Sequence, residues 1–470
     1  MTGPVTVTLD REPIDRLVST FADERHCPTL SWGITIDDRL TTGQIGGVSE
    51  HTVYRIASMT KSFSAAAVLL LRDDGVLRLD DPAVAHAPEL SALDRIDSAP
   101  ITIRDLLSMT SGLPTDDPWA DRHLDLTDDE FDRIISDRPL FAFPTGDAFE
   151  YSNFGFAVLG RVIHRATGER IQDIVTRRLL EPLGMTRTTW TAPDHDDWAR
   201  PTRWLDGAHV AELEPLPDGL IAPMGGLWTS VSDLNRWITW LDDAVPARAE
   251  PDLGPLSRAS RREMQSPQRY SKMTTVRGVR SSSSYGFGLR MLDEPDLGTV
   301  VTHSGGLPGY GSNMRWLAGR RVGAIALANT TYAPMAELTA LLLDQVAAQG
   351  LAPDEAIPVS ASIADLAPRL VAVLNSWDDA NADALFTASL IQDDGLDRRR
   401  AAAERLTAAT GALTIDTIEA HSGARATVRC TGSLGRHASV TILLAPPRPP
   451  RIQSYTARLE PVDDTADTGG

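Results

Sequence analysis

The stretch that decides the fold of this chain is SMTKSFSAAAVLLLRDDG, residues 58–75. Its alanines and leucines favour a helix, and Gly75 is a typical helix stop. Ser58 and Lys61 then lie one helical turn apart on the same face, so the amine can reach the hydroxyl. The N-terminus of the helix adds a partial positive field that favours an alkoxide-like oxygen. We interpret Ser58 as a candidate nucleophile, against the alternative of a capping serine followed by a surface lysine.

Lysine is rare in this chain, which makes each lysine informative. Of the 45 basic residues, only Lys61 and Lys272 are lysines and the other 43 are arginines. Arginine keeps its proton in proteins, whereas a desolvated lysine can lose its proton and serve as a base. This count supports a chemical role for Lys61.

A second polar cluster, Tyr151-Ser152-Asn153, precedes an apolar helical run. A tyrosine beside a nucleophile can relay a proton, and an asparagine amide can hold a lysine and the acyl group of a substrate. Simple packing of a tyrosine at a helix start is the structural alternative.

A third cluster, HSGG at residues 303–306, closes a strand-like run. Gly305 and Gly306 let a substrate approach the backbone beside Ser304, and the Gly306 N–H is a candidate partner of the Ser58 N–H in an oxyanion hole. His303 is the only one of the ten histidines in such a context, with a structural histidine as the alternative.

The three clusters, in this order, resemble the active site of class C β-lactamases, penicillin-binding D-Ala-D-Ala carboxypeptidases and their esterase and D-aminopeptidase relatives. That family carries Ser-x-x-Lys, Tyr-x-Asn and Lys or His-x-Gly. The resemblance covers about residues 5–349. Further stretches that look like the family are IRDLLSMTSGL (103–113), FEYSNFGFAVLG (149–160), LEPLGM (180–185) and GGLWTSVSDL (225–234).

The resemblance implies a fold of the α/β (α+β) class: a two-lobed β-lactamase/transpeptidase-like domain with an antiparallel sheet, a helical lobe and a cleft between them. It also implies a serine hydrolase that cleaves an ester or amide bond through an acyl-enzyme on Ser58. Lys61 and Tyr151 would share proton transfer, with the actual base left open. Asn153 would orient Lys61 and substrate, and His303 would support the tyrosine and the far end of the substrate.

One departure from the β-lactamase pattern concerns His303, which stands where those enzymes usually carry lysine. A mostly neutral imidazole attracts a substrate carboxylate less than an ammonium does. This favours an esterase or a peptidase-like amidase acting on a small molecule or short peptide, with β-lactams left open. A catalytically silent ligand sensor or assembly protein is the alternative from another class.

Other hydrolase classes lack their sequence signals. No Gly-x-Ser-x-Gly pentapeptide occurs, so an α/β-hydrolase is set aside. The histidines are scattered, so we expect no metal, and no cofactor is indicated. Cys27 and Cys430 lie far apart in the sequence and are expected to be reduced structural residues.

Length and patterning predict more than one domain in these 470 residues. We expect a hydrolase domain over 1–350, a linker over 351–359, a small α+β domain over 360–460 and a disordered tail over 461–470. The predicted helices of the first domain are 12–24, 58–74, 103–109, 128–136, 154–166, 171–180, 231–241 and 334–349. Its predicted strands are 29–36, 286–292, 299–304, 312–317 and 322–329, with a turn-like stretch at 37–47. The small domain is predicted to hold helices at 363–374, 380–390 and 398–409 and then four strands.

Charge and hydropathy bear on partners and location. A net charge of −19 repels phosphate backbones and anionic lipids, so neither nucleic acid nor a membrane is expected as a partner. Charged residues interrupt the first thirty positions, and no apolar run approaches the roughly 20 residues of a membrane span. We expect a soluble cytoplasmic protein, and leave its assembly open between a monomer and a homodimer.

Overall fold

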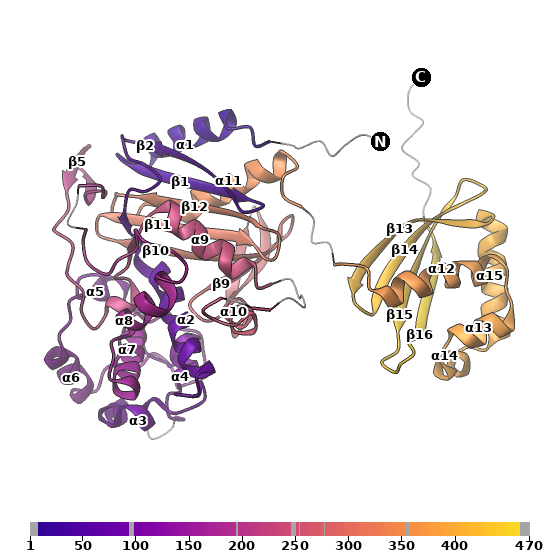
Figure 1. Ribbon diagram of the computed structural model, residues 1–470, viewed down its shortest axis with the longest axis horizontal. Helices are drawn as coiled ribbons and strands as arrows, with labels where there is room; N and C mark the ends of the chain where they lie inside the picture. Colours follow the sequence, from indigo (N-terminus) through magenta and orange to yellow (C-terminus); the bar gives the residue numbers. More distant parts are fainter. Residues whose placement is uncertain are drawn as a thin grey trace. The chain divides into compact units, whose positions relative to one another are not determined.

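Figure 1 shows a computed structural model of the chain, which describes residues 8–93, 98–193, 196–245, 251–252, 254–276, 278–353 and 357–460. The residues before 354 contain an eight-stranded antiparallel sheet in the order β2-β1-β12-β11-β10-β9-β8-β7. Its strands are β1 (Leu30–Ile36), β2 (Arg39–Ile45), β7 (Arg269–Val276), β8 (Val279–Tyr285), β9 (Arg290–Glu294), β10 (Gly298–Leu307), β11 (Tyr310–Leu317) and β12 (Val322–Ala328).

Helices cover both faces of this sheet. On one face lie α1 (Glu12–Glu24) and α11 (Met335–Ala348), and on the other lies α9 (Val231–Asp242) (Figure 1). Strand β12 serves both layers, because its side chains alternate between the two faces. Its alanines pack under α1 and α11, whereas Ile325 and Leu327 belong to the core beneath α9. This double burial explains why β12 is apolar throughout.

A helical lobe fills the stretch between β2 and β7. Its central helices, α2 (Thr60–Asp73) and α7 (Phe154–Thr167), are buried over most of their length, as expected for helices without a solvent face. Around them lie α3 (Ala83–His86), α4 (Ile103–Leu107), α5 (Asp117–Ala120), α6 (Asp128–Ser136), α8 (Ile171–Val175) and α10 (Arg258–Met264). Short strands pair as β3 (Tyr54–Arg55) with β6 (Trp228–Thr229) and β4 (Thr202–Leu205) with β5 (Ala208–Ala211). The predicted fold class is confirmed.

Three details of the predicted sheet were wrong. The turn-like stretch 37–47 contains strand β2, because Asp37 and Asp38 take positive φ angles of 48° and 65° and form a tight hairpin turn. The strand predicted from 286 begins only at Arg290, after a turn in which Gly288 has a φ of 67°. Strands β7 and β8 were missed because their serines and exposed side chains give no apolar alternation.

Residues 357–460 form a second compact unit with its own core. Four helices precede an antiparallel sheet in the order β13-β14-β15-β16. The predicted helix 380–390 is two helices, because Thr387 leaves the helical conformation and caps the second helix by accepting the Leu390 N–H. The elements are α12 (Ala361–Asn375), α13 (Asp379–Leu385), α14 (Ala388–Asp393), α15 (Leu396–Thr410), β13 (Leu413–Ser422), β14 (Arg425–Gly432), β15 (His437–Leu444) and β16 (Ile452–Leu459).

The remaining predictions about single segments have different outcomes. Cys27 and Cys430 are buried free thiols, and burial raises the pKa of each to about 11. The predicted disordered tail, 461–470, lies outside the described residues. Among the helices that the structure describes, none combines the length and the apolarity that a membrane crossing needs.

Candidate active site

Ser58 lies in a tight turn at the entrance to α2. The 3-10 turn Ala57–Met59 leads directly into the helix, and Ala57 has a φ of 49°, which an alanine rarely adopts. Lys61 follows in the first turn of α2, and its Nζ donates to Oγ of Ser58 at 2.9 Å. The Ser-x-x-Lys spacing therefore brings hydroxyl and amine into direct contact.

The Lys61 side chain is fully buried. Besides Ser58, its Nζ donates to Oδ1 of Asn153 at 2.6 Å and to the carbonyl oxygen of Met224 at 2.9 Å. Burial lowers the pKa of Lys61 to about 7, although nearby aspartates oppose the change. The amine can then lose its proton near neutral pH, so Lys61 can accept a proton.

Asn153 connects Lys61 to a pair of aspartates. Its Nδ2 donates to Oδ1 of Asp117 at 2.7 Å, while its backbone N–H donates to Oδ1 of Asp116 at 2.8 Å. The second oxygen of Asp116 accepts the Phe154 N–H, also at 2.8 Å, at the start of α7. Asn153 is completely buried and held at both its main chain and its amide.

Tyr151 lies between Lys61 and the sheet. Its ring centroid is 4.9 Å from Nζ of Lys61 and 6.3 Å from the ring centroid of Tyr285, which stands edge-on. Burial raises the pKa of Tyr151 well above its usual 10, and a hydrogen bond with Ser58 only partly opposes this. Tyr151 is therefore protonated at neutral pH and can donate a proton.

His303 lies on β10 and faces the same tyrosines. Its Nδ1 is 2.7 Å from the carbonyl oxygen of Ser304, so Nδ1 carries the proton and donates it. Its Nε2 then accepts the hydroxyl of Tyr285 at 3.1 Å. Burial lowers the pKa of His303 to about 3, with Lys61 acting in the same direction. The expected partner was Tyr151, but the direct hydrogen bond goes to Tyr285.

The glycines after His303 allow β10 to run beside the turn that holds Ser58. A Cβ on Gly305 would clash with the carbonyl oxygen of Ile56, and one on Gly306 would lie 2.9 Å from the ring of Tyr332. Ser304 is fixed by the amide of Asn313, which donates to its Oγ at 2.9 Å. The close approach of β10 to the Ser58 turn therefore depends on the absence of a side chain at Gly305.

These residues open onto a cleft of about 610 Å³. Its lining includes the predicted residues Ser58, Tyr151, His303, Ser304 and Gly306. Lys61, Asn153 and Gly305 lie behind that surface in the contacts described above. The structure thus brings all eight predicted site residues together.

The cleft also contains charged residues that the sequence reading missed. Asp117 and Asp121 line it together with Tyr332, whose hydroxyl donates to Asp121 at 2.8 Å. Burial raises the pKa of Asp121 to about 7. The helix-start signal Asp-Asp-Pro at 116–118 could have marked the aspartates as structural, but nothing local relates them to Asn153.

Arg290 and Lys272 supply positive charge to the same cleft. The Arg290 guanidinium donates to Oγ of Ser271 at 3.0 Å and to Oγ of Ser283 at 3.1 Å. It also lies 5.5 Å from the ring centroid of Phe149. In the residues that the structure describes, no carboxylate forms an ion pair with Arg290. Its remaining N–H groups can therefore bind an anion.

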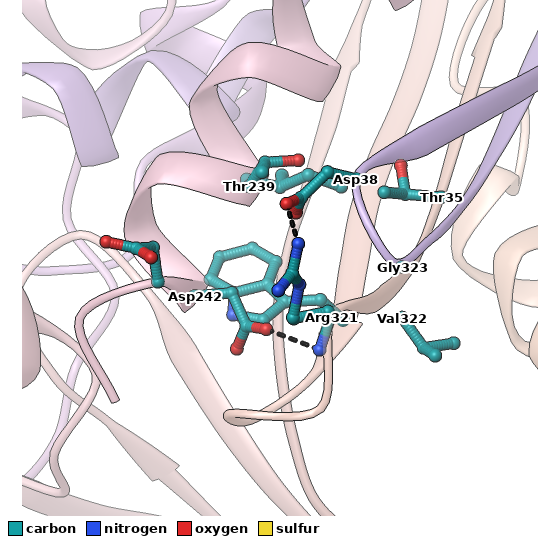
Figure 2. A pocket seen from close by; sticks show the side chains of 10 residues that line it. Thr35, Asp38, Thr239, Asp242, Arg321, Val322 and Gly323 are labelled. Carbon is teal, nitrogen blue, oxygen red and sulfur yellow. Dashed lines mark hydrogen bonds and ion pairs between the residues drawn. The ribbon is translucent and has the colours of Figure 1, made fainter. Parts of the chain in front are cut away.

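A second, smaller hollow of about 50 Å³ lies between α9 and the turn that joins β11 to β12 (Figure 2). Asp242 accepts the Arg321 backbone N–H there at 2.8 Å, and the Arg321 guanidinium forms an ion pair with Asp38. None of the predicted site residues lines it. Its charged groups hold helix and sheet together.

Comparisons with known proteins find a family and several relatives. A sequence model of the family described as Beta-lactamase matches residues 14–348. Protein flp of Staphylococcus aureus (strain N315) is 26% identical over 333 residues, which cover 68% of this chain and 63% of that protein. Penicillin-binding protein 4* of Bacillus subtilis (strain 168) is 28% identical over 302 residues, which cover 59% of this chain and 61% of that protein. The chain therefore spans less than two thirds of the length of these relatives.

A solved structure resembles most of the chain in its fold. The octameric penicillin-binding protein homologue from Pyrococcus abyssi has a TM-score of 0.62 and 21% sequence identity, covering 93% of this chain and 91% of its own. At this identity the likeness concerns the fold alone.

Proposed function

Because this chain belongs to the beta-lactamase family, we propose that it is a serine hydrolase that cleaves an ester or amide bond through an acyl-enzyme on Ser58. The observation that carries the proposal is the contact between Nζ of Lys61 and Oγ of Ser58 at 2.9 Å, made by a fully buried amine with a pKa of about 7. A buried neutral amine beside a hydroxyl is the arrangement that activates a serine without a histidine.

Acylation starts with proton transfer from Ser58 to neutral Lys61. The Ser58 oxygen then forms a bond to the substrate carbonyl carbon, and the carbonyl electrons move to its oxygen. When the tetrahedral intermediate collapses, the bond to the leaving group breaks and the leaving group takes a proton from Tyr151, which Lys61 restores. The pKa values favour this division, because Lys61 can be neutral at pH 7, whereas Tyr151 is protonated before the reaction and so holds a proton to donate.

Deacylation repeats the sequence with water as the nucleophile. Lys61 accepts a proton from the water, which attacks the acyl carbon. When this intermediate collapses, the bond to Ser58 breaks and the Ser58 oxygen takes a proton from Tyr151, which Lys61 restores. Asn153 keeps Lys61 in place, and the N–H groups of Ser58 and Gly306 are the proposed donors to the oxyanion. Gly305 and Ser304 give the substrate access to the edge of β10.

The cations of the cleft bear on the substrate. His303 is neutral at physiological pH and cannot attract a carboxylate by charge, whereas Arg290 lines the cleft with spare donors. This supports an acyl donor that carries a carboxylate, such as a short peptide with a free C-terminus, including a D-amino-acid peptide, or a β-lactam. A neutral ester would use the same Ser58 chemistry without this contact.

The experiment that tests the proposal combines a covalent probe with a substrate screen. We expect intact-mass measurement and peptide mapping to find one fluorophosphonate or penicillin adduct, located on Ser58. A screen of p-nitrophenyl esters, D-aminoacyl anilides, D-amino-acid dipeptides and a chromogenic cephalosporin should then yield turnover for at least one class. A wild-type protein without adduct or turnover would support the silent ligand sensor or assembly protein.

The assembly state is a further part of the proposal. The sequence leaves a monomer and a homodimer open, and the octamer named for the Pyrococcus abyssi homologue adds a third state. Sedimentation velocity over a range of concentrations distinguishes the three.

A further inference from the structure

We propose that Asp117 is a positioning residue, which fixes the Asn153 amide with its oxygen toward Lys61 and acts on the charge of Lys61 through that amide. This inference rests on the proposed function, because it concerns the amine that activates Ser58. Asp117 is connected to Ser58 through Asn153 and Lys61, so it need not touch substrate.

The Asn153 amide is oriented by its two hydrogen-bond partners, Lys61 and Asp117. Nζ of Lys61 donates to the Asn153 amide, and in its protonated form it can only donate hydrogen bonds, whereas the Asp117 carboxylate only accepts them. Asn153 lies between the two, with Oδ1 at 2.6 Å from Nζ of Lys61 and Nδ2 at 2.7 Å from Oδ1 of Asp117. A flipped amide would face N–H against N–H and oxygen against oxygen. Asp117 and Lys61 together therefore leave a single favourable orientation.

The main chain at Asn153 is held by a different aspartate. Asp116, the neighbour of Asp117, accepts the backbone N–H groups of Asn153 and Phe154. The two aspartates thus hold the backbone and the amide of Asn153 separately. Loss of Asp117 should free the amide while Asp116 keeps the backbone in place.

Asp117 also affects the charge of Lys61. Within the described part of the chain, no carboxylate lies in ion-pair range of Lys61, so the hydrogen-bonded route to negative charge runs through Asn153 to Asp117. The charges of three aspartates favour the protonated amine. Asp117 has the largest effect, followed by Asp116 and Asp121. The other titratable groups that face the Lys61 amine are Tyr151 and His303. Both are neutral at pH 7, so these aspartates supply the opposing charge.

The test titrates Lys61 directly. Lysine labelled with ¹³C at Cε gives only two resonances in a chain with two lysines, and a Lys272→Arg background assigns the one from Lys61. Asp117→Asn keeps an oxygen that can accept from the Asn153 amide but loses the negative charge. We therefore expect the titration midpoint of Lys61 to fall by about half a pH unit or more. Asp117→Glu should keep the wild-type midpoint. The matched control Asp129→Asn removes an exposed charge from the first turn of α6 and should not move it.

Activity separates the two effects of Asp117. Asp117→Asn should shift the acid limb of the pH–rate profile to lower pH and keep most of the plateau rate, whereas Asp117→Ala should also lose about tenfold or more of that rate. An unchanged Lys61 midpoint in folded Asp117→Asn would overturn the proposal, as would equal plateau rates for Asp117→Asn and Asp117→Ala. If Asp117→Asn does not fold, Asp117→Ser replaces it. The NMR titration needs no turnover, so it remains decisive even if Ser58 proves inert.

Discussion

The hydroxyl of Tyr285 lies 3.1 Å from Nε2 of His303, in agreement with the neutral state that burial favours for this histidine. With Nδ1 donating to the Ser304 carbonyl, the imidazole has one donor and one acceptor, both satisfied. Protonation of Nε2 would break the hydrogen bond from Tyr285 and place a charge on a buried ring. His303 therefore acts as a neutral support for the cleft wall, and Lys61 carries the acid–base chemistry.

Lys61→Arg is expected to lower kcat/KM about a thousandfold or more, close to the effect of Ser58→Ala. The guanidinium preserves the charge but cannot lose its proton at working pH, so the hydroxyl has no base. Steady-state kinetics with an activated ester, on variants shown to be folded by circular dichroism, measure the difference. Near-normal turnover by Lys61→Arg would show that Lys61 is not the base.

The rate should rise with pH around a midpoint near 7. The protonated amine cannot accept the Ser58 proton, so activity is low below the Lys61 pKa and high above it. His303 has a pKa of about 3, so its protonation should cause no change of the rate above pH 5. A profile of kcat/KM from pH 5 to 9 tests this, and a flat profile would contradict the assignment.

Lys61→Met should abolish activity and stabilise the fold. The native pKa of about 7 lies below the ordinary 10.5, so between these values the unfolded chain binds more protons at Lys61 than the folded one. Wild-type stability should therefore rise with pH relative to Lys61→Met, by about 1 kcal/mol per pH unit above pH 7. Urea unfolding at pH 7, 8 and 9 measures the difference in the free energy of unfolding between Lys61→Met and the wild type. This difference should become smaller at higher pH. A constant difference would mean that Lys61 titrates alike in both states.

Arg290→Ala should raise KM about tenfold or more for substrates with a carboxylate and leave neutral esters nearly unaffected. The lost contact is a charge-assisted hydrogen bond with a substrate anion. Arg290→Lys keeps the charge without the planar fork and should show an intermediate KM. Equal losses on charged and neutral substrates would instead indicate that Arg290 supports the cleft wall.

Gly305→Ala should cost about 1–3 kcal/mol of stability and reduce activity as well, because the new methyl group would meet the Ile56 carbonyl two residues before Ser58. Gly423→Ala is the matched control, since nothing lies within 4 Å of a Cβ built there. Thermal unfolding and ester turnover are the measurements. An unperturbed Gly305→Ala would contradict the close packing of β10 against the Ser58 turn.

Local sequence predicted the parts of the site that depend on short spacing. The three-residue interval between Ser58 and Lys61 is sufficient for contact because a helix turn brings them together. The buried helices α2 and α7 and the core strands β10 to β12 were recognisable because their apolar patterns are strong. The resemblance to the family supplied the relation between segments as distant as Ser58, Tyr151 and His303.

Contacts that arise only in three dimensions could not be predicted. Asp117 meets the amide of Asn153 across 36 positions, and Tyr285 on β8 meets His303 on β10 across 18 positions. Neither residue carries a local signal of its role. Arg290 was overlooked for a similar reason, since one arginine among 43 is informative only once it is known to line the cleft.

A ¹³C titration of Lys61 in the wild-type chain shows whether a buried amine with a low pKa activates Ser58. We expect a midpoint near 7 for the Lys61 resonance. A midpoint near 10.5 would mean that Lys61 keeps its proton at working pH and cannot be the base.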